Sequence, residues 1–139
     1  TYGLVGSAAN AIAPGKRPLS SMMPTFLETP DLVVALGTPG GSRIISMMLL
    51  AGLEVAAGRG DARAWINRPR FHHQYLPDEV EYEPAAFDAR AARRLANLGY
   101  KLKRLYTEYG NMQAVVWYKN ENRLDAASDA RGDGAARVQ

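Results

Sequence analysis

Two adjacent hydroxyls are the first side chains in this sequence whose type and spacing could carry chemistry. Ser20 and Ser21 lie in a loop bounded by Pro18 and Pro24. Both hydroxyls could donate hydrogen bonds to one carboxylate or phosphate. A serine-rich turn that satisfies its own backbone is the simpler interpretation, and the segment taken alone favours it.

A second candidate is the glycine-rich segment Gly37–Arg43, which contains Gly40 and Gly41. Glycines leave backbone N–H groups accessible because they carry no Cβ, and a helix N-terminus behind them adds partial positive charge. This arrangement can bind a phosphate or stabilise a developing oxyanion. The segment has neither the ending of a Walker loop nor the spacing of a dinucleotide fingerprint, which disfavours nucleotide binding. A plain tight turn remains an alternative.

Periodicity predicts the elements that position these residues. The apolar run 31–36 predicts a buried strand. Residues 43–57 predict a helix capped by Ser42, and its apolar side chains cover more than one face, so we expect it to be largely buried. Residues 1–25 are expected to form an extended loop. The remaining predictions are helices over 61–66 and 88–98, the latter with Ala91, Ala92, Leu95 and Leu98 inward, strands over 79–82, 100–105, 113–118 and 123–127, and core positions for Trp65 and Trp117.

Composition bounds the classes of protein to consider. The chain has 139 residues, 47% of them hydrophobic, enough for one packed domain, which we place at residues 1–127 with a frayed tail over 128–139. Mixed helices and strands suit an α/β or α+β layered domain. No apolar run is long enough to span a membrane, and the absence of cysteine excludes disulfides and thiolate metal sites.

Charge and histidine content point away from two further classes. The net charge is +3, and the basic residues of 90–104 are interpreted as solvent-facing sides of a helix and a strand, so no nucleic-acid partner is expected. The His72-His73 pair could suggest a metal site. Because adjacent histidines project differently and no acidic partner stands at ligand spacing, structural packing is favoured.

Four segments together resemble one known family. Asn10–Thr25 resembles the PLSSM-x-PT region of gamma-glutamyltranspeptidases, and Gly40–Ile45 follows inside a pattern similar to G-S/T-P-G-G-S-R-I. Asn67–Asp78 is similar to N-x-PRFHHQ-x-LPDE, and Ala126–Arg131 resembles GASDPR with Ala in place of Gly and of Pro. These matches follow one another in order along almost the whole chain.

The resemblance implies an α+β fold: a partial αββα sandwich of an N-terminal nucleophile hydrolase, formed by the C-terminal portion of the small subunit. It implies an autoprocessed enzyme that cleaves the gamma-glutamyl amide of glutathione and transfers the acyl group to water, an amino acid or a peptide. The implied partner is the large subunit of the same precursor. No cofactor and no metal are expected, and a periplasmic or secreted location follows from the resemblance only.

The same resemblance assigns site residues. Ser20 and Ser21 would hold the α-carboxylate of the gamma-glutamyl group, Gly40 and Gly41 would form the oxyanion hole, and Tyr2 would match the tyrosine of the lid loop. The family's nucleophilic threonine lies well upstream of the segment matching Tyr2, so Thr1 is not its counterpart. We therefore expect this chain by itself to be inactive.

Three alternatives remain open at this stage. One is a cephalosporin acylase-like relative, and another is an enzyme that processes poly-gamma-glutamate. The third is a non-catalytic homologue or fragment that only binds or assembles.

Overall fold

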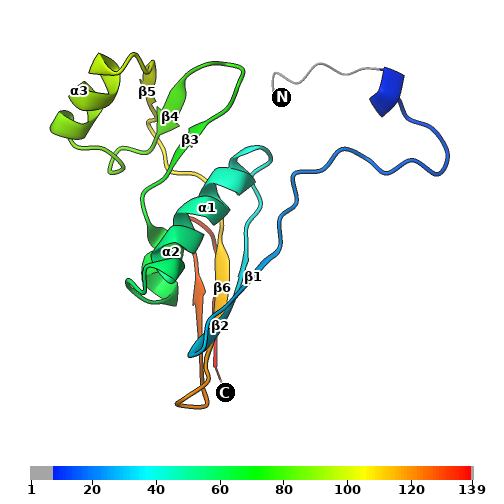
Figure 1. Cartoon of the computed structure of the whole chain (residues 1–139), viewed down its shortest axis with the longest axis vertical. Coiled ribbons are helices and arrows are strands. Elements are labelled where there is room, and N and C mark those ends of the chain that lie inside the picture. The colour runs from blue at the N-terminus through cyan, green and yellow to red at the C-terminus, as the bar shows by residue number, and fades with distance from the viewer. Residues whose placement is uncertain (1–7, 139) are drawn as a thin grey trace.

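The computed structural model describes residues 8–138 and shows an α+β arrangement within them. A four-stranded antiparallel sheet has the strand order β1-β2-β6-β7. Helices α1 and α2 lie along one face of this sheet, as Figure 1 shows. The bounds are β1 Thr25–Glu28, β2 Leu32–Gly37, β6 Gln113–Tyr118, β7 Arg123–Ser128, α1 Arg43–Ala56 and α2 Ala62–Asn67.

The core lies between this sheet and the two helices. Val34 of β2 and Val116 of β6 are register partners, and both are completely buried. Side chains alternate between the faces of a strand, so every second residue of β2 and β6 points to the helices. The helices contribute Met47, Met48, Trp65 and Ile66, among others, to this core.

The opposite face of the sheet carries exposed apolar side chains. They are Phe26, Val115, Trp117 and Leu124, from β1, β6 and β7. Trp65 is 4% exposed, as expected of a core residue, whereas Trp117 is 42% exposed, contrary to the expectation. Trp117 lies one position beyond the inward-facing Val116, and the period of two turns it to the side without helices.

A smaller sheet adjoins the first. It has the order β3-β4-β5, with bounds β3 Phe71–His73, β4 Val80–Tyr82 and β5 Leu102–Arg104. The β4 and β5 strands are parallel because the crossover helix α3, Ala89–Asn97, connects them. This helix has no fully buried residue among those described, and Leu98, expected to point inward, is exposed.

Helix α1 departs from two expectations. Ser42 has helical dihedral angles and forms no side-chain cap, because an N-cap needs an extended backbone and the preceding glycines already make the turn. The helix is also amphipathic and not buried all round: Ile45, Leu49 and Leu53, spaced by one turn, are exposed. No helix among the described residues is long and apolar enough to cross a membrane.

Residues 128–131, the first part of the expected frayed tail, are held by contacts to the rest of the structure. Strand β7 extends to Ser128, and Asp129 is only 1% exposed. The Ala130 N–H donates to Asn67 Oδ1 at 2.9 Å, which ties the segment to the end of α2. Ion pairs hold these residues in place. The composition of the segment, which is rich in small and charged residues, does not indicate such pairing. Two short strands, β1 and β3, were also not predicted.

Candidate active site

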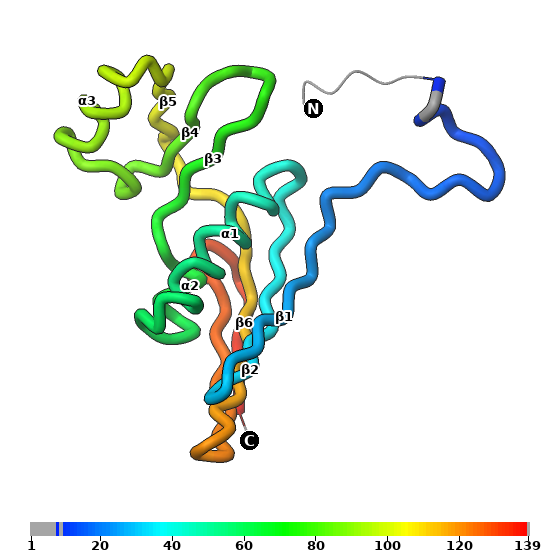
Figure 2. Tube along the Cα trace, viewed as in Figure 1, coloured from blue at the N-terminus to red at the C-terminus, as the bar shows by residue number. Residues whose placement is uncertain are grey.

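The loop that carries Ser20 and Ser21 is extended and exposed. Figure 2 shows residues 8–24 running out from the start of β1, away from the helices. Ser21 is half-buried, and its hydroxyl donates to the Gly41 carbonyl at 2.8 Å, across a sequence separation of 20 residues. The Ser20 hydroxyl accepts from the Met22 N–H at 3.1 Å. The structure therefore brings the serine segment and the glycine segment together through Ser21.

The Gly40–Gly41 turn has a backbone that other residues rarely adopt. Gly40 has φ 149° and Gly41 has φ 60°, both in the region that favours glycine. The Gly41 carbonyl also accepts the Ile44 N–H, at 3.1 Å. Within residues 8–138 no acceptor meets the N–H of either glycine. Two unpaired donors at the start of a helix are the groups an oxyanion hole requires.

Two adjacent pockets open beside these segments. One, of about 330 Å³, is lined by Ser20 and Ser21 together with Leu19, Ile45, Ser46, His73 and Tyr75. The other, of about 300 Å³, is lined by Gly40 and Gly41 together with Arg43, Pro77 and Glu81. Both pockets share a wall formed by Ser42, His72 and Gln74. The candidate carboxylate and oxyanion groups thus face neighbouring spaces.

Charged and aromatic groups surround the second pocket. The Arg43 guanidinium pairs with the Glu81 carboxylate and lies 4.6 Å from the centre of the Tyr109 ring. Burial alone would raise the pKa of Glu81, but hydrogen bonds from Lys103 and Arg43 outweigh it and lower that pKa. Glu81 is therefore ionised at neutral pH. Burial, reinforced by the charge of Glu83, raises the pKa of Tyr109 to about 12, so its phenol is neutral.

A chain of polar side chains runs from Ser46, in the first pocket, through His72 and Gln74 of the shared wall. Ser46 Oγ lies 2.6 Å from His72 Nδ1, and His72 Nε2 lies 3.0 Å from Gln74 Oε1. His72 is buried, whereas His73 is exposed and pairs with Asp78. The described residues contain no group of three or more His, Cys, Asp or Glu side chains that could hold a metal ion. From the sequence, His72 was expected only to pack or to bind a metal, and no pattern singled out Ser46.

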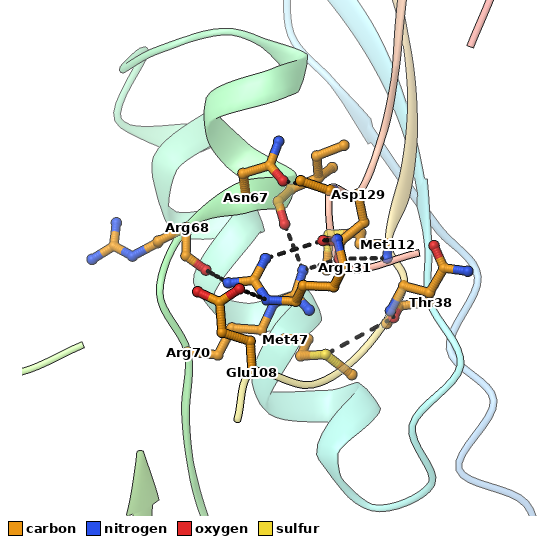
Figure 3. A network of polar contacts seen from close by, with 12 residues as sticks. Thr38, Met47, Asn67, Arg68, Arg70, Glu108, Met112, Asp129 and Arg131 are labelled. Atoms are coloured by element: carbon orange, nitrogen blue, oxygen red, sulfur yellow. Dashed lines mark hydrogen bonds and ion pairs between the residues drawn. The ribbon is translucent and has the colours of Figure 1, made fainter. Parts of the chain in front are cut away.

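The structure also contains a cluster of buried charged side chains. Arg70, Glu83, Asp129 and Arg131, hereafter the buried charge cluster, have almost fully buried side chains. Arg131 donates to Glu83 at 2.7 Å and to Asp129 at 3.0 Å. Arg70 pairs with Asp129, and Figure 3 shows these arginines and Asp129 converging from the segments that follow β7 and α2. The cluster thus joins two of the four motif segments, Asn67–Asp78 and Ala126–Arg131.

Comparison with known proteins decides the family. The family model for gamma-glutamyltranspeptidase matches residues 1–139. This chain belongs to the gamma-glutamyltranspeptidase family. The resemblance inferred from the four motifs is therefore confirmed, and the family is one of enzymes.

Individual relatives support the same family assignment. The glutathione hydrolase proenzyme of Escherichia coli is 41% identical over 94% of this chain, which covers 22% of that protein. Scoloptoxin SSD20 of Scolopendra dehaani is 42% identical over 96% of this chain, which covers 68% of that protein. The gamma-glutamyltranspeptidase T380A mutant of Helicobacter pylori has a TM-score of 0.81 at 37% identity, covering 94% of this chain and 72% of that one.

These comparisons confirm the predicted partial N-terminal nucleophile hydrolase fold. The chain spans about a fifth of the length of the E. coli proenzyme. The roles of individual residues stay predictions. Tyr2, predicted as the lid tyrosine, lies outside the described residues.

Proposed function

We propose that this chain supplies the carboxylate-binding and oxyanion-stabilising parts of an enzyme that cleaves gamma-glutamyl amides. The observation that carries the proposal is the hydrogen bond from Ser21 to the Gly41 carbonyl, which joins the two segments. When substrate binds, Ser20 and Ser21 hold the α-carboxylate of the glutamyl group, and Ser21 turns its single hydroxyl proton from the Gly41 carbonyl to the carboxylate. The unpaired N–H groups of Gly40 and Gly41 then donate hydrogen bonds to the oxyanion that forms as the amide carbonyl is attacked.

The reaction that fits this site is acyl transfer through a covalent intermediate. A threonine hydroxyl from an upstream segment attacks the gamma-carbonyl carbon, and its own α-amine takes the proton. The amide C–N bond breaks, and the leaving amine takes a proton. Water, an amino acid or a peptide then attacks the acyl-enzyme and releases the threonine. Glutathione is the proposed donor, in line with the name of the E. coli relative.

The proposal extends to the surroundings of the chain. Relatives are proenzymes, which supports a partner subunit cut from the same precursor. The apolar face of the larger sheet, with Phe26, Trp117 and Leu124, is a surface that the second sheet of an αββα sandwich would cover. We further propose a periplasmic or secreted location, which rests on family resemblance alone.

Serine substitutions in the full-length protein test the carboxylate site. Ser20→Ala combined with Ser21→Ala should raise KM for gamma-glutamyl-p-nitroanilide, because hydrogen bonds to a charged group contribute about 1.5–3 kcal/mol each. The exposed Thr107→Ala is the matched hydroxyl control and should change neither KM nor kcat. Unchanged KM and kcat in the double variant would sink the carboxylate assignment.

The isolated chain tests the proposed division of labour. Because the nucleophile belongs to the upstream segment in this proposal, residues 1–139 alone should not turn over gamma-glutamyl-p-nitroanilide. Adding the upstream coding segment with its threonine should restore release of p-nitroaniline. If the upstream sequence offers no such threonine, a protein that only binds or assembles becomes the better interpretation.

A further inference from the structure

Two polar contacts connect the first turn of α1 to the smaller sheet. Ser46 Oγ lies 2.6 Å from His72 Nδ1, and the Arg43 guanidinium pairs with the Glu81 carboxylate. His72 of β3 and Glu81 of β4 are direct register partners. One cross-strand pair therefore contacts two residues of the same helical turn, and that turn begins two positions after Gly41.

The far end of the Ser46–His72–Gln74 chain fixes the direction of its hydrogen bonds. The Gln74 amide nitrogen donates to the Leu76 carbonyl at 2.5 Å, so Gln74 Oε1 faces His72 Nε2 as an acceptor. His72 Nε2 then donates to Gln74, and Nδ1 lies within hydrogen-bond distance of the Ser46 hydroxyl. A buried histidine with both nitrogens occupied holds Ser46 in one orientation.

The charged contact is fixed from several sides as well. Glu81 also accepts from Lys103 Nζ at 2.9 Å, on the neighbouring strand β5. Arg43 lies over the ring of Tyr109, which is half-buried against the core cluster. Glu81 and Arg43 therefore have little freedom to shift relative to the smaller sheet.

We propose that the His72–Glu81 pair positions the Gly40–Gly41 turn for oxyanion binding, by clamping the first turn of α1 through Ser46 and Arg43. This inference rests on the proposed function. All four residues act as positioning residues, since they hold the helix from which the turn extends. Before substrate binds, Ser21 also donates to the Gly41 carbonyl. An oxyanion hole requires its donors at 2.7–3.1 Å from the oxyanion, so a small displacement of the helix start is enough to weaken it.

Two histidine substitutions in the full-length protein separate positioning from general packing. In His72→Asn the side-chain oxygen can take the place of Nδ1 and keep the contact to Ser46. In His72→Gln the longer amide reaches the place of Nε2 and keeps only the contact to Gln74. We expect His72→Gln and Ser46→Ala to lower kcat about tenfold to a hundredfold with KM changed little, because a misplacement near 1 Å has that effect on rate. His72→Asn should retain most of the wild-type kcat. The midpoint of thermal unfolding should be the same for His72→Asn and His72→Gln.

The charged contact has a matched control at the other end of the same helix. Arg43→Gln should lower kcat while leaving KM within about twofold, whereas Arg59→Gln, which removes an exposed pair to Glu54, should leave both unchanged. A double-mutant cycle with Glu81→Gln should show that Arg43 and Glu81 affect kcat through each other.

The outcomes distinguish this inference from the proposed function. Full-length wild type that does not turn over gamma-glutamyl substrates refutes the proposed function, and the inference with it. An active wild type with unchanged kcat in Ser46→Ala, His72→Gln and Arg43→Gln refutes the inference alone. Equal losses of kcat in His72→Asn and His72→Gln would also overturn it, because packing and not the contact to Ser46 would then be responsible.

Discussion

The buried charge cluster and the candidate active site both join motif segments that are distant in sequence, but they are held in different ways. In the cluster, Glu83 and Asp129 each accept several hydrogen bonds, and almost no water reaches their side chains. In the site, one hydrogen bond links an exposed loop to a glycine turn. The contrast indicates that the cluster contributes to keeping the fold intact, whereas the geometry of the site depends on few contacts.

The cost of removing one partner explains this contrast. A buried ion pair adds little net stability, because desolvation offsets the attraction between its charges. Loss of one partner leaves the other charge buried and uncompensated, which is strongly destabilising. The cluster is therefore intolerant of substitution, while the exposed serine loop can change without unfolding the protein.

The largest effect is expected from Asp129→Ala. This change leaves the buried Arg70 without its carboxylate partner and removes one of the carboxylates that Arg131 contacts, so that Arg131 keeps Glu83. The free energy of unfolding should fall by about 3–5 kcal/mol, as measured by chemical denaturation of the full-length protein. The exposed pair of Arg123 and Glu121 is the control, and Arg123→Ala should change stability by less than about 1 kcal/mol. Similar losses in the two variants would remove the contrast between buried and exposed charges.

Gly40→Ala is expected to destabilise the protein less than Asp129→Ala does, but to lower kcat strongly. A φ of 149° is open almost only to glycine, and an added Cβ would lie 2.6 Å from Met47 Cε. The strain should destabilise the protein by about 1–3 kcal/mol. Because the turn must shift to relieve it, kcat for gamma-glutamyl-p-nitroanilide should fall while KM changes little. Gly52→Ala in the middle of α1, where a Cβ makes an ordinary contact, should leave kcat unchanged.

Acid should weaken the cluster before it affects the neutral parts of the core. Burial acts to raise the pKa of Asp129, but hydrogen bonds from the Met112 N–H, Arg70 and Arg131 outweigh it and lower the pKa below the ordinary value of 3.8. Because this pKa is lowered, the contribution of ionised Asp129 to the free energy of unfolding is fully present above pH 3.8. That contribution is lost as the pH falls through the pKa of Asp129 in the folded state. Unfolding free energies measured down to roughly pH 3 should fall less steeply in Asp129→Asn than in wild type. Parallel curves would contradict this role for Asp129.

The smallest expected effect separates the two tryptophans. In the structure Trp65 of α2 is buried in the core, whereas Trp117 lies on the open face of the sheet. In Trp65→Phe, which leaves Trp117 as the reporter, acrylamide should quench fluorescence more strongly than in Trp117→Phe. If a second sheet covers the open face in the full-length protein, that difference should narrow there. Equal quenching in residues 1–139 alone would contradict the exposed position of Trp117.

Local patterns were enough to predict most of the secondary structure. Helix α1, strand β2 and the β6–β7 hairpin lie within one or two residues of their expected positions, because each depends on periodicity and on nearby glycines. The strands β1 and β3 were missed because they are short and gain their hydrogen bonds only from distant partners. Ser42 was wrongly expected to cap α1, since the dihedral angles of the preceding turn cannot be derived from residue types.

The sequence by itself determined the family and the candidate residues, because four motifs in order carry that information. Only the tertiary structure decided that Ser21 meets Gly41, that His72 and Glu81 together contact the start of α1, and that Glu83 and Asp129 are buried beside two arginines. Each of these facts is a contact between residues far apart along the chain. Periodicity reports which side of its own element a residue occupies, and it does not report which distant side chain that residue meets.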